Sequence, residues 1–273
     1  MYLVTGANGQ LGSELKQILG DKAQYADVAD LDITNTDAVI EFFAGKSFEA
    51  IINCAAYTAV DKAESDADIA RKVNVDGPCN LAKTGVPIVH ISTDYVFDGK
   101  AYMPYAEADK TNPQSVYGVT KLESEKAVME NASSCVIIRT AWLYSAFGNN
   151  FVKTMRKLGA ERESLNVIFD QIGTPTYARD LAQVIADILP QMYGRKEIYH
   201  FSNEGVCSWY DFALEIMVLS GLKCNVLPIE TKDYLTAAKR PHYSVLNKAK
   251  IKKDFGLEIN HWKVSLSKCL EEM

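Results

Sequence analysis

The chain has 273 residues, of which 48% are hydrophobic and 23% charged, so it is long enough to bury the core of one large domain or of a domain with a smaller lobe. Its net charge is −6 with no long basic stretch, which argues against nucleic acid as the main partner but leaves room for a phosphate-bearing small molecule. No signal segment precedes Met1 and no apolar run reaches membrane-spanning length, which predicts a cytoplasmic protein.

The cysteine and histidine residues do not form the patterns of a metal site or a disulfide framework. The six cysteines and four histidines are dispersed, with no C-x-x-C pair and no zinc-like spacing. We therefore expect reduced, buried thiols and no catalytic metal.

The first predicted elements are a short strand at Tyr2–Val4, a glycine-rich turn and an amphipathic helix at Leu11–Leu19. Gly6, Gly9 and Gly12 follow the spacing G-x-x-G-x-x-G. Glycines at such points allow a tight turn, close approach of the backbone to a pyrophosphate and close packing of helix on strand. The pyrophosphate then lies on free N–H groups at the helix N-terminus. The turn therefore predicts nucleotide binding.

The sequence signal for a second strand, around Ala23–Ala26, is weak, and several acidic residues follow it. Asp27 falls where an acidic residue commonly binds the 2′-hydroxyl of the adenine ribose, which favours NADH slightly. Asp30 and Asp32 compete for that assignment, so the choice between NADH and NADPH stays open. The stretch from Leu31 to Asn35 then caps a predicted helix that runs to Phe43.

A buried third strand is predicted at 48–54, followed by small residues at 55–58, where the second half of a cofactor would pass. A helix is expected over 65–84, although Pro78 favours a kink. The fourth strand, 86–92, ends in hydroxyl and acidic side chains that suit a binding site and, equally, a turn. The long loop that follows, 100–115, is of the length that is usually functional or disordered.

Residues 117–126 are predicted to begin a helix. Tyr117 and Lys121 are four residues apart and therefore project from the same face. An ammonium group beside a phenol favours the phenolate, which predicts that the pKa of Tyr117 falls towards the range of an acid–base catalyst. The alternative is an ordinary helix start with an exposed tyrosine and a solvated lysine.

A strand at 135–139 completes an alternation of strands and helices that predicts an α/β fold with a doubly wound, parallel, Rossmann-like sheet. We assign residues 1–143 to an NAD(P)-binding domain and 144–273 mainly to a smaller C-terminal substrate-binding lobe, with some segments returning to the first domain. The elements predicted for this second half are helices at 151–158, 179–189, 208–219 and 264–272 and strands at 166–169, 197–201 and 224–229.

Six motifs occur in order along nearly the whole chain and together resemble the extended short-chain dehydrogenase/reductases, and within them the sugar-nucleotide 4-ketoreductases. They are G-A-N-G-Q-L-G (6–12), A-A-Y-T-A-V-D-K-A-E (55–64), S-T-D-Y-V-F-D-G (92–99), Y-G-V-T-K (117–121), R-T-A-W (139–142) and R-P (240–241). The second and third strings are far more specific than a glycine triplet.

The resemblance implies hydride transfer from NADPH or NADH to the C4 keto group of a nucleotide sugar. Tyr117 would donate the proton, Lys121 would lower the pKa of Tyr117 and bind the nicotinamide ribose, and Thr93 would hydrogen-bond the sugar carbonyl. The implied cofactor-binding residues are Gly6, Asn8, Gly9, Gln10, Leu11, Gly12, Asp32, Ile33, Ala55, Ala56, Tyr57, Thr58, Tyr117 and Lys121. The implied substrate-binding residues are Thr93, Asp94, Tyr95 and Trp142, with core packing an equal alternative for Trp142.

Glu14 matches a position that helps to bind magnesium at a dimer interface in some family members. We favour a solvated helix glutamate there and predict no metal. Arg139 is expected to support the end of its strand. The expected partner is a nucleotide-sugar substrate, without nucleic acid or membrane, and the expected assembly is a monomer or a homodimer.

Three alternatives compete with this assignment. One is a non-catalytic, NADP-binding regulatory subunit resembling that of methionine adenosyltransferase, but Thr93, Tyr117 and Lys121 together favour an enzyme. Another is a related dehydratase or epimerase. A dehydratase would place an Asp-Glu pair after Thr93, whereas this chain has Asp94 and Tyr95, which favours simple reduction. The third is a reductase for another nucleotide 4-keto sugar.

Overall fold

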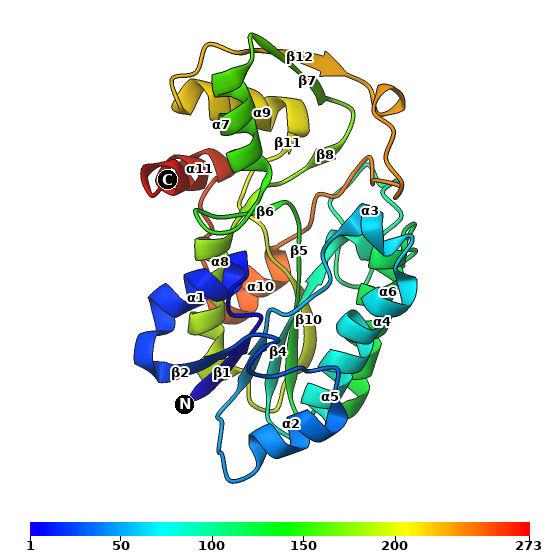
Figure 1. Cartoon of the computed structure of the whole chain (residues 1–273), viewed down its shortest axis with the longest axis vertical. Helices are drawn as coiled ribbons and strands as arrows, with labels where there is room; N and C mark the ends of the chain where they lie inside the picture. Colours follow the sequence, from blue (N-terminus) through cyan, green and yellow to red (C-terminus); the bar gives the residue numbers. More distant parts are fainter.

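The computed structural model describes residues 1–273, and its centre is a six-stranded parallel sheet (Figure 1). The strand order is β10-β5-β4-β3-β1-β2. β2 lies on one side of β1 and β3 on the other, so the direction in which the chain crosses the sheet reverses at β1. In open α/β sheets, ligands bind at the carboxyl ends of the strands at such a point, here between β1 and β3. The predicted doubly wound sheet is confirmed. Its strands are β1 (Tyr2–Thr5), β2 (Ala23–Ala26), β3 (Ile51–Asn53), β4 (Ile88–Thr93), β5 (Cys135–Thr140) and β10 (Lys196–His200).

Helices cover both faces of the sheet because its strands are apolar on both sides. Successive residues of a strand point to opposite faces, so Leu3 enters one core and Val4 the other. The Val4 face is covered by α1 (Gln10–Leu19), α8 (Ala178–Ile188) and α10 (Ala249–Phe255). The Leu3 face is covered by α2 (Thr36–Phe43), α5 (Gly77–Ala82) and α6 (Val116–Asn131). None of the helices combines the length and the apolar character that crossing a membrane would need.

A smaller body with its own apolar core stands beyond the carboxyl ends of the strands (Figure 1). Phe212 and Trp262 lie at its centre, in edge-to-face contact at 5.7 Å between ring centroids. It contains α7 (Phe151–Glu161), α9 (Trp209–Leu219), α11 (Trp262–Glu271) and the parallel pair β7 (Ser164–Ile168) and β12 (Asn225–Ile229). Two short pairs connect it to the sheet region, namely β6 (Leu143–Tyr144) with β9 (Thr176–Tyr177) and β8 (Ile172–Gly173) with β11 (Cys207–Ser208).

The helix expected over 65–84 is not a single α-helix. After the short α3 (Val60–Ala63), the segment consists of α4 (Ala67–Arg71), a π-helical turn at Lys72–Asp76, and α5. Pro78, in the first turn of α5, has no N–H for the carbonyl group four residues earlier, so α-helical pairing fails at that point. The wider turn carries the buried Asn74, and such turns are frequent at functional sites.

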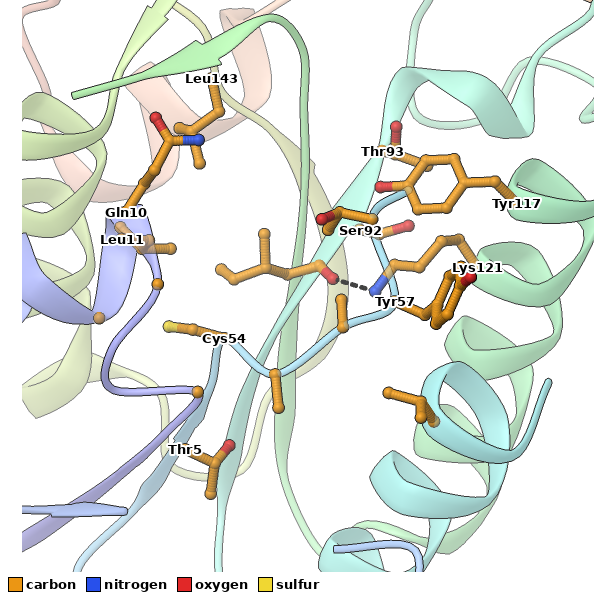
Figure 2. Close-up of a pocket in the computed structure, with 18 of the residues that line it drawn as sticks. Thr5, Gln10, Leu11, Cys54, Tyr57, Ser92, Thr93, Tyr117, Lys121 and Leu143 are labelled. Carbon is orange, nitrogen blue, oxygen red and sulfur yellow. Dashed lines mark hydrogen bonds between the residues drawn. The ribbon is translucent and has the colours of Figure 1, made fainter. Parts of the chain in front are cut away.

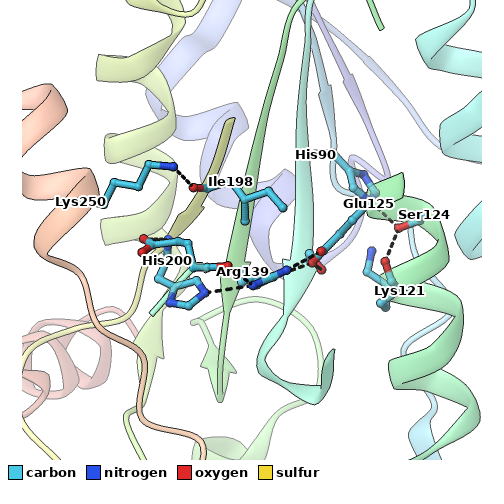
Figure 3. A network of polar contacts seen from close by, with 10 residues as sticks. His90, Lys121, Ser124, Glu125, Arg139, Ile198, His200 and Lys250 are labelled. Atoms are coloured by element: carbon cyan, nitrogen blue, oxygen red, sulfur yellow. Dashed lines mark hydrogen bonds and ion pairs between the residues drawn. The ribbon is translucent and has the colours of Figure 1, made fainter. Parts of the chain in front are cut away.

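Helix α6 docks through polar rather than apolar side chains. Val128 is its only large apolar side chain that is buried, whereas Lys121, Ser124 and Glu125 are all buried. Figure 3 shows Ser124 beside His90 of β4 and Glu125 beside Arg139 of β5. The carboxylate of Glu125 accepts two hydrogen bonds from Arg139 of β5, at 2.8 and 2.7 Å, and one from the Ser92 hydroxyl of β4 at 2.5 Å. Arg139 thus supports its strand, as expected.

We expect Arg139→Met to lower the free energy of unfolding by about 3–5 kcal/mol, because it leaves Glu125 buried without its cation. The matched control is Arg71→Met, which breaks the ion pair of Arg71 with Glu123 on the surface of the same helix and should cost about 1 kcal/mol or less. Urea denaturation of both variants measures the two losses. Equal losses would contradict a structural role for the buried pair.

Candidate active site

One cavity of about 1110 Å³ lies at the carboxyl ends of β1, β3, β4 and β5 (Figure 2). Every site residue predicted from the sequence lines it except Asn8. They are Gly6, Gly9, Gln10, Leu11, Gly12, Asp32, Ile33, Ala55, Ala56, Tyr57, Thr58, Thr93, Asp94, Tyr95, Tyr117, Lys121 and Trp142. Residues that are distant in sequence therefore meet at a single site.

The glycine-rich turn leaves the N-terminus of α1 free for an anion. No side chain caps α1 at Gly9, whereas side chains cap α2, α6, α7 and α9. Gly6 has φ +66°, and a Cβ there would lie 2.6 Å from the backbone nitrogen of Ala55. A Cβ on Gly12 would collide with the carbonyl oxygen of Gly6. The turn therefore fits the pyrophosphate of a dinucleotide, since it offers uncapped N–H groups and a backbone that no larger residue could form.

Asp27 follows β2 and lines the cavity beside this turn. Its carboxylate accepts hydrogen bonds from the backbone N–H groups of Asn8, at 2.9 Å, and Val28, at 2.8 Å. Asn8 itself is exposed and lies outside the cavity, so its contribution is to fix the turn through Asp27. The only basic side chains in the cavity lining are Lys72 and Lys121.

Asn74 holds the cavity wall at 55–58 against helix α6. Its side-chain oxygen accepts from the Tyr57 N–H at 2.8 Å, and its amide donates to the Tyr57 carbonyl at 3.2 Å and to the Thr120 hydroxyl at 3.0 Å. Asn74 belongs to none of the sequence motifs and was not among the predicted site residues. Its only signal was a polar residue in the middle of a predicted helix.

Tyr117 and Thr93 lie together at the end of the cavity opposite the glycine turn (Figure 2), and the Tyr95 ring is in edge-to-face contact with Tyr117 at 5.5 Å between ring centroids. Burial raises the pKa of the Tyr117 phenol, and the Thr93 hydroxyl opposes this effect only in part. The predicted lowering of the pKa is therefore wrong. Loss of solvation dominates the pKa of this phenol, and Asp94 raises it further, whereas Lys121 is not among the groups that lower it. The phenol stays protonated at neutral pH, which is the form of a proton donor.

Lys121 is also buried, with 2% of its surface exposed. Its Nζ donates a hydrogen bond to the Ile91 carbonyl at 2.6 Å (Figure 2). Burial lowers the pKa of Lys121 to about 8, although Glu125 and Cys54 act in the opposite direction. The lysine is therefore a desolvated cation fixed to the end of β4, not the solvated side chain of the alternative reading.

Thr93 and Asp94 form a turn and line the cavity at the same time. The Thr93 hydroxyl accepts from the Tyr95 N–H at 3.2 Å and donates to Asp94 Oδ1 at 2.9 Å. Asp94 is 3% exposed, and its Oδ2 has no hydrogen-bond partner. Burial raises the pKa of Asp94 to about 6. A buried carboxylate oxygen that faces a cavity is suited to accept a hydrogen bond from a ligand hydroxyl.

Trp142 is the only residue other than glycine with a positive φ, at 50°. A bulky side chain in this conformation costs about 1–3 kcal/mol and persists only where the surroundings enforce it. Trp142 lines the cavity, and its indole stacks on Trp209 with 3.6 Å between ring centroids. The sequence left core packing and cavity lining as alternatives for Trp142, and in the structure the residue has both roles.

Two long-range contacts at the site had no usable signal in the sequence. Arg240 donates to the Tyr95 hydroxyl at 3.0 Å and pairs with Asp61 at 2.5 Å, which joins the R-P and T-A-V-D-K-A-E motifs beside the Tyr117 ring. Asn150 lines the cavity and donates to the Gln10 side chain at 3.1 Å. It follows an irregular segment where no element was predicted.

Glu14 is fully buried, so the expectation of a solvated helix glutamate is wrong. It lies one turn from Leu11 on the face of α1 that packs against α8. Ser145 donates to its Oε1 at 2.5 Å, its Oε2 has no partner, and burial raises the pKa of the carboxyl group. No three His, Cys, Asp or Glu side chains lie close enough together to hold a metal ion.

A doubly wound sheet with a glycine turn at one end of its cavity and Thr93, Tyr117 and Lys121 at the other defines an extended short-chain dehydrogenase/reductase. The family model described as RmlD substrate binding domain matches residues 1–273. The chain belongs to this family, whose members include the dTDP-4-dehydrorhamnose reductases.

Individual relatives agree with this assignment over nearly the full length. A dTDP-4-dehydrorhamnose reductase of Aggregatibacter actinomycetemcomitans is 42% identical over 97% of this chain and 96% of the relative. The crystal structure of a Clostridium acetobutylicum dTDP-4-dehydrorhamnose reductase is 47% identical, with a TM-score of 0.94 over 99% of this chain and 98% of that chain. The Bacillus anthracis enzyme of the same name, solved in complex with NADP, is 40% identical, with a TM-score of 0.95 over 100% and 99%.

From the lowered pKa of Lys121 we predict how the free energy of unfolding depends on pH. The folded protein releases this proton near pH 8, whereas an unfolded lysine releases it near pH 10.5. Between these values the unfolded state binds more protons, so the Lys121 contribution to the free energy of unfolding rises with pH. The difference in unfolding free energy between the parent protein and Lys121→Met should therefore grow in favour of the parent across this window.

Urea denaturation at several pH values within that window measures the difference. Lys126→Met, at an exposed position of the same helix, controls for the loss of a lysine. A difference for Lys121→Met that does not change with pH would contradict the assigned titration.

Proposed function

We propose that the chain reduces the C4 keto group of dTDP-4-dehydro-L-rhamnose to give dTDP-L-rhamnose, with NADPH or NADH as the reductant. The observation that carries this proposal is that Thr93, Tyr117 and Lys121 line the same cavity as the uncapped N-terminus of α1. Membership of a family that includes reductases of this name supports the choice of substrate. The structure of the Bacillus anthracis relative in complex with NADP supports the choice of cofactor.

In this proposal the glycine turn and the N-terminus of α1 bind the pyrophosphate of the dinucleotide, through the backbone of residues 8–12. Asp32 and Ile33 bind the adenosine half, and Ala55 to Thr58 pass along the nicotinamide half, where Tyr117 and Lys121 bind the ribose. The bound nicotinamide supplies the hydride. Because the cavity walls come from four strand ends, the cofactor would be fixed along its whole length.

Tyr117 is proposed to donate the proton that the reduced carbonyl oxygen takes up. Burial keeps its phenol protonated, so the acid form is present when the alkoxide develops. The Lys121 ammonium then stabilises the phenolate that remains. Thr93 turns its hydroxyl from Asp94 to the carbonyl oxygen, so that negative charge develops against a fixed donor.

Asp94, Tyr95 and Trp142 are proposed to bind the sugar nucleotide. The unpaired Oδ2 of Asp94 would accept a hydrogen bond from a sugar hydroxyl, and the Trp142 indole would cover the ring. Residues 1–143 would bind the cofactor and also supply these three residues, and residues 144–273 would form mainly the substrate-binding lobe beside them. The unpaired cysteine thiols support a cytoplasmic location.

The direct test follows the absorbance of reduced nicotinamide when purified protein meets dTDP-4-dehydro-L-rhamnose. We expect oxidation of NADPH or NADH and formation of dTDP-L-rhamnose. Nucleotide 4-keto sugars with another base or another sugar serve as comparison substrates, and a higher kcat/KM for one of them would replace the proposed substrate. If the protein binds the cofactor but reduces none of these nucleotide sugars, the proposal that it is an enzyme is overturned and a regulatory subunit is favoured.

We expect Tyr117→Phe to lower kcat by about a hundredfold or more, because a positioned proton donor contributes about that much. Tyr25→Phe is the matched control, since Tyr25 lies outside the cavity and its hydroxyl contacts only the Gly20 carbonyl. Steady-state kinetics of both variants give the comparison. A Tyr117→Phe enzyme with the kcat of the parent would mean that another group donates the proton.

A further inference from the structure

The backbone of Trp142 is held in its unfavourable conformation by the second body of the molecule. Trp142 follows β5 directly, and its carbonyl accepts from the Thr176 N–H at 3.1 Å. Its indole stacks on Trp209, the first residue of α9, with an interplanar angle of 11°. The edge of the indole lies over Gly173 of β8, where a Cβ would be 2.7 Å from Trp142 Cε2.

Trp209 and Gly173 are themselves fixed relative to each other. Cys207 and Ser208 of β11 pair with Gly173 and Ile172 of β8, so the strand that leads into α9 runs beside Gly173. A capping box between Ser208 and Asp211 fixes the first turn of α9. The Phe151 ring packs on the Trp209 ring at 4.6 Å between centroids.

Neither Trp209 nor Gly173 lines the cavity, whereas Trp142 does. The stacking of Trp209 and the absence of a Cβ at Gly173 therefore affect the cavity only through Trp142. The stack acts together with the hydrogen bond from Thr176 to the Trp142 carbonyl, so its loss removes one of the contacts that hold Trp142 at this φ and orient its indole.

We propose that Trp209 and Gly173 are positioning residues for the nucleotide sugar, which hold the Trp142 indole against the substrate end of the cavity. This inference rests on the proposed function, because it takes the ligand at that end to be a nucleotide sugar. It places a determinant of substrate affinity in β8 and α9, outside the site itself. The cofactor end of the cavity, at residues 6–12, is formed without these elements.

Trp209→Leu should raise the KM for dTDP-4-dehydro-L-rhamnose by about tenfold, which corresponds to about 1.4 kcal/mol. The KM for the reduced nicotinamide and kcat should change by less than about threefold, because Tyr117, Thr93 and the glycine turn are untouched. Trp209→Phe, which keeps an aromatic ring, should restore most of the affinity. Gly173→Ala, whose Cβ would press on the indole edge and on the Ser244 hydroxyl without altering Trp209, should also raise the KM for the sugar nucleotide.

A spectroscopic readout separates positioning from a merely structural role. The chain has three tryptophans, and only Trp142 and Trp209 are stacked on each other. Paired indoles give a coupled signal in far-ultraviolet circular dichroism, so the parent should show a couplet that Trp209→Leu lacks. Trp262→Phe, which changes the remaining tryptophan, should keep the couplet. Urea denaturation of each variant confirms that it is folded under assay conditions.

The outcomes are distinct. The inference is supported if the parent enzyme reduces the substrate and if Trp209→Leu loses the couplet and shows a rise in the KM for the sugar nucleotide alone. The inference is overturned if Trp209→Leu loses the couplet but keeps the parent's KM for the sugar nucleotide. It is also overturned if both KM values rise equally, or if the parent shows no couplet. If Trp209→Leu does not fold, Gly173→Ala decides by the two KM values alone: a selective rise in the KM for the sugar nucleotide supports the inference, and an unchanged KM or an equal rise in both overturns it. A parent without turnover removes the proposed function, and the inference with it.

Discussion

The docking of helix α6 on strand β4 is the contact on which the site depends. Ser124 and Glu125 of the helix bind the His90 ring and the Ser92 hydroxyl (Figure 3), and Lys121 binds the carbonyl of Ile91, which lies between them in the strand (Figure 2). Arg139 of β5 adds the cation that neutralises Glu125. Because unpaired polar groups are costly when buried, a helix attached in this way has one favourable position rather than a sliding apolar interface. That position sets where Tyr117 stands relative to Thr93.

The same network reaches the cofactor end of the cavity. Ser124 donates to the Lys121 carbonyl, so the His90 Nε2 serves as the donor to Ser124 and its Nδ1 accepts from Asn53. Burial lowers the pKa of His90 well below its usual range, which agrees with a neutral ring in these roles. Asn53 in turn accepts from Thr5, so a single polar chain crosses β1, β3 and β4 into α6. Tyr117 and the glycine turn are therefore connected by one network of polar contacts.

The sequence predicted the sheet well because its strands are short apolar runs separated by turn residues, and Asn35 caps α2 as expected. It predicted which residues line the cavity through motifs, with only Asn8 outside. It could not predict how α6 docks, since a polar interface leaves no hydrophobic period. Nor could it predict the pKa of Tyr117 or the burial of Glu14, because both depend on desolvation by distant elements. The contact between Asp61 and Arg240 spans 179 residues, a pairing that local patterns do not encode.

The central claim is that this framework holds a nicotinamide cofactor and a 4-keto sugar nucleotide so that hydride passes directly between them. The most direct measurement uses reduced cofactor dideuterated at C4 of the nicotinamide, with dTDP-4-dehydro-L-rhamnose as substrate. Proton and carbon NMR of the product locates the label. Direct transfer predicts dTDP-L-rhamnose with one deuterium, at C4 of the sugar. A product without deuterium at that carbon, or with deuterium at another carbon of the sugar, would contradict the account.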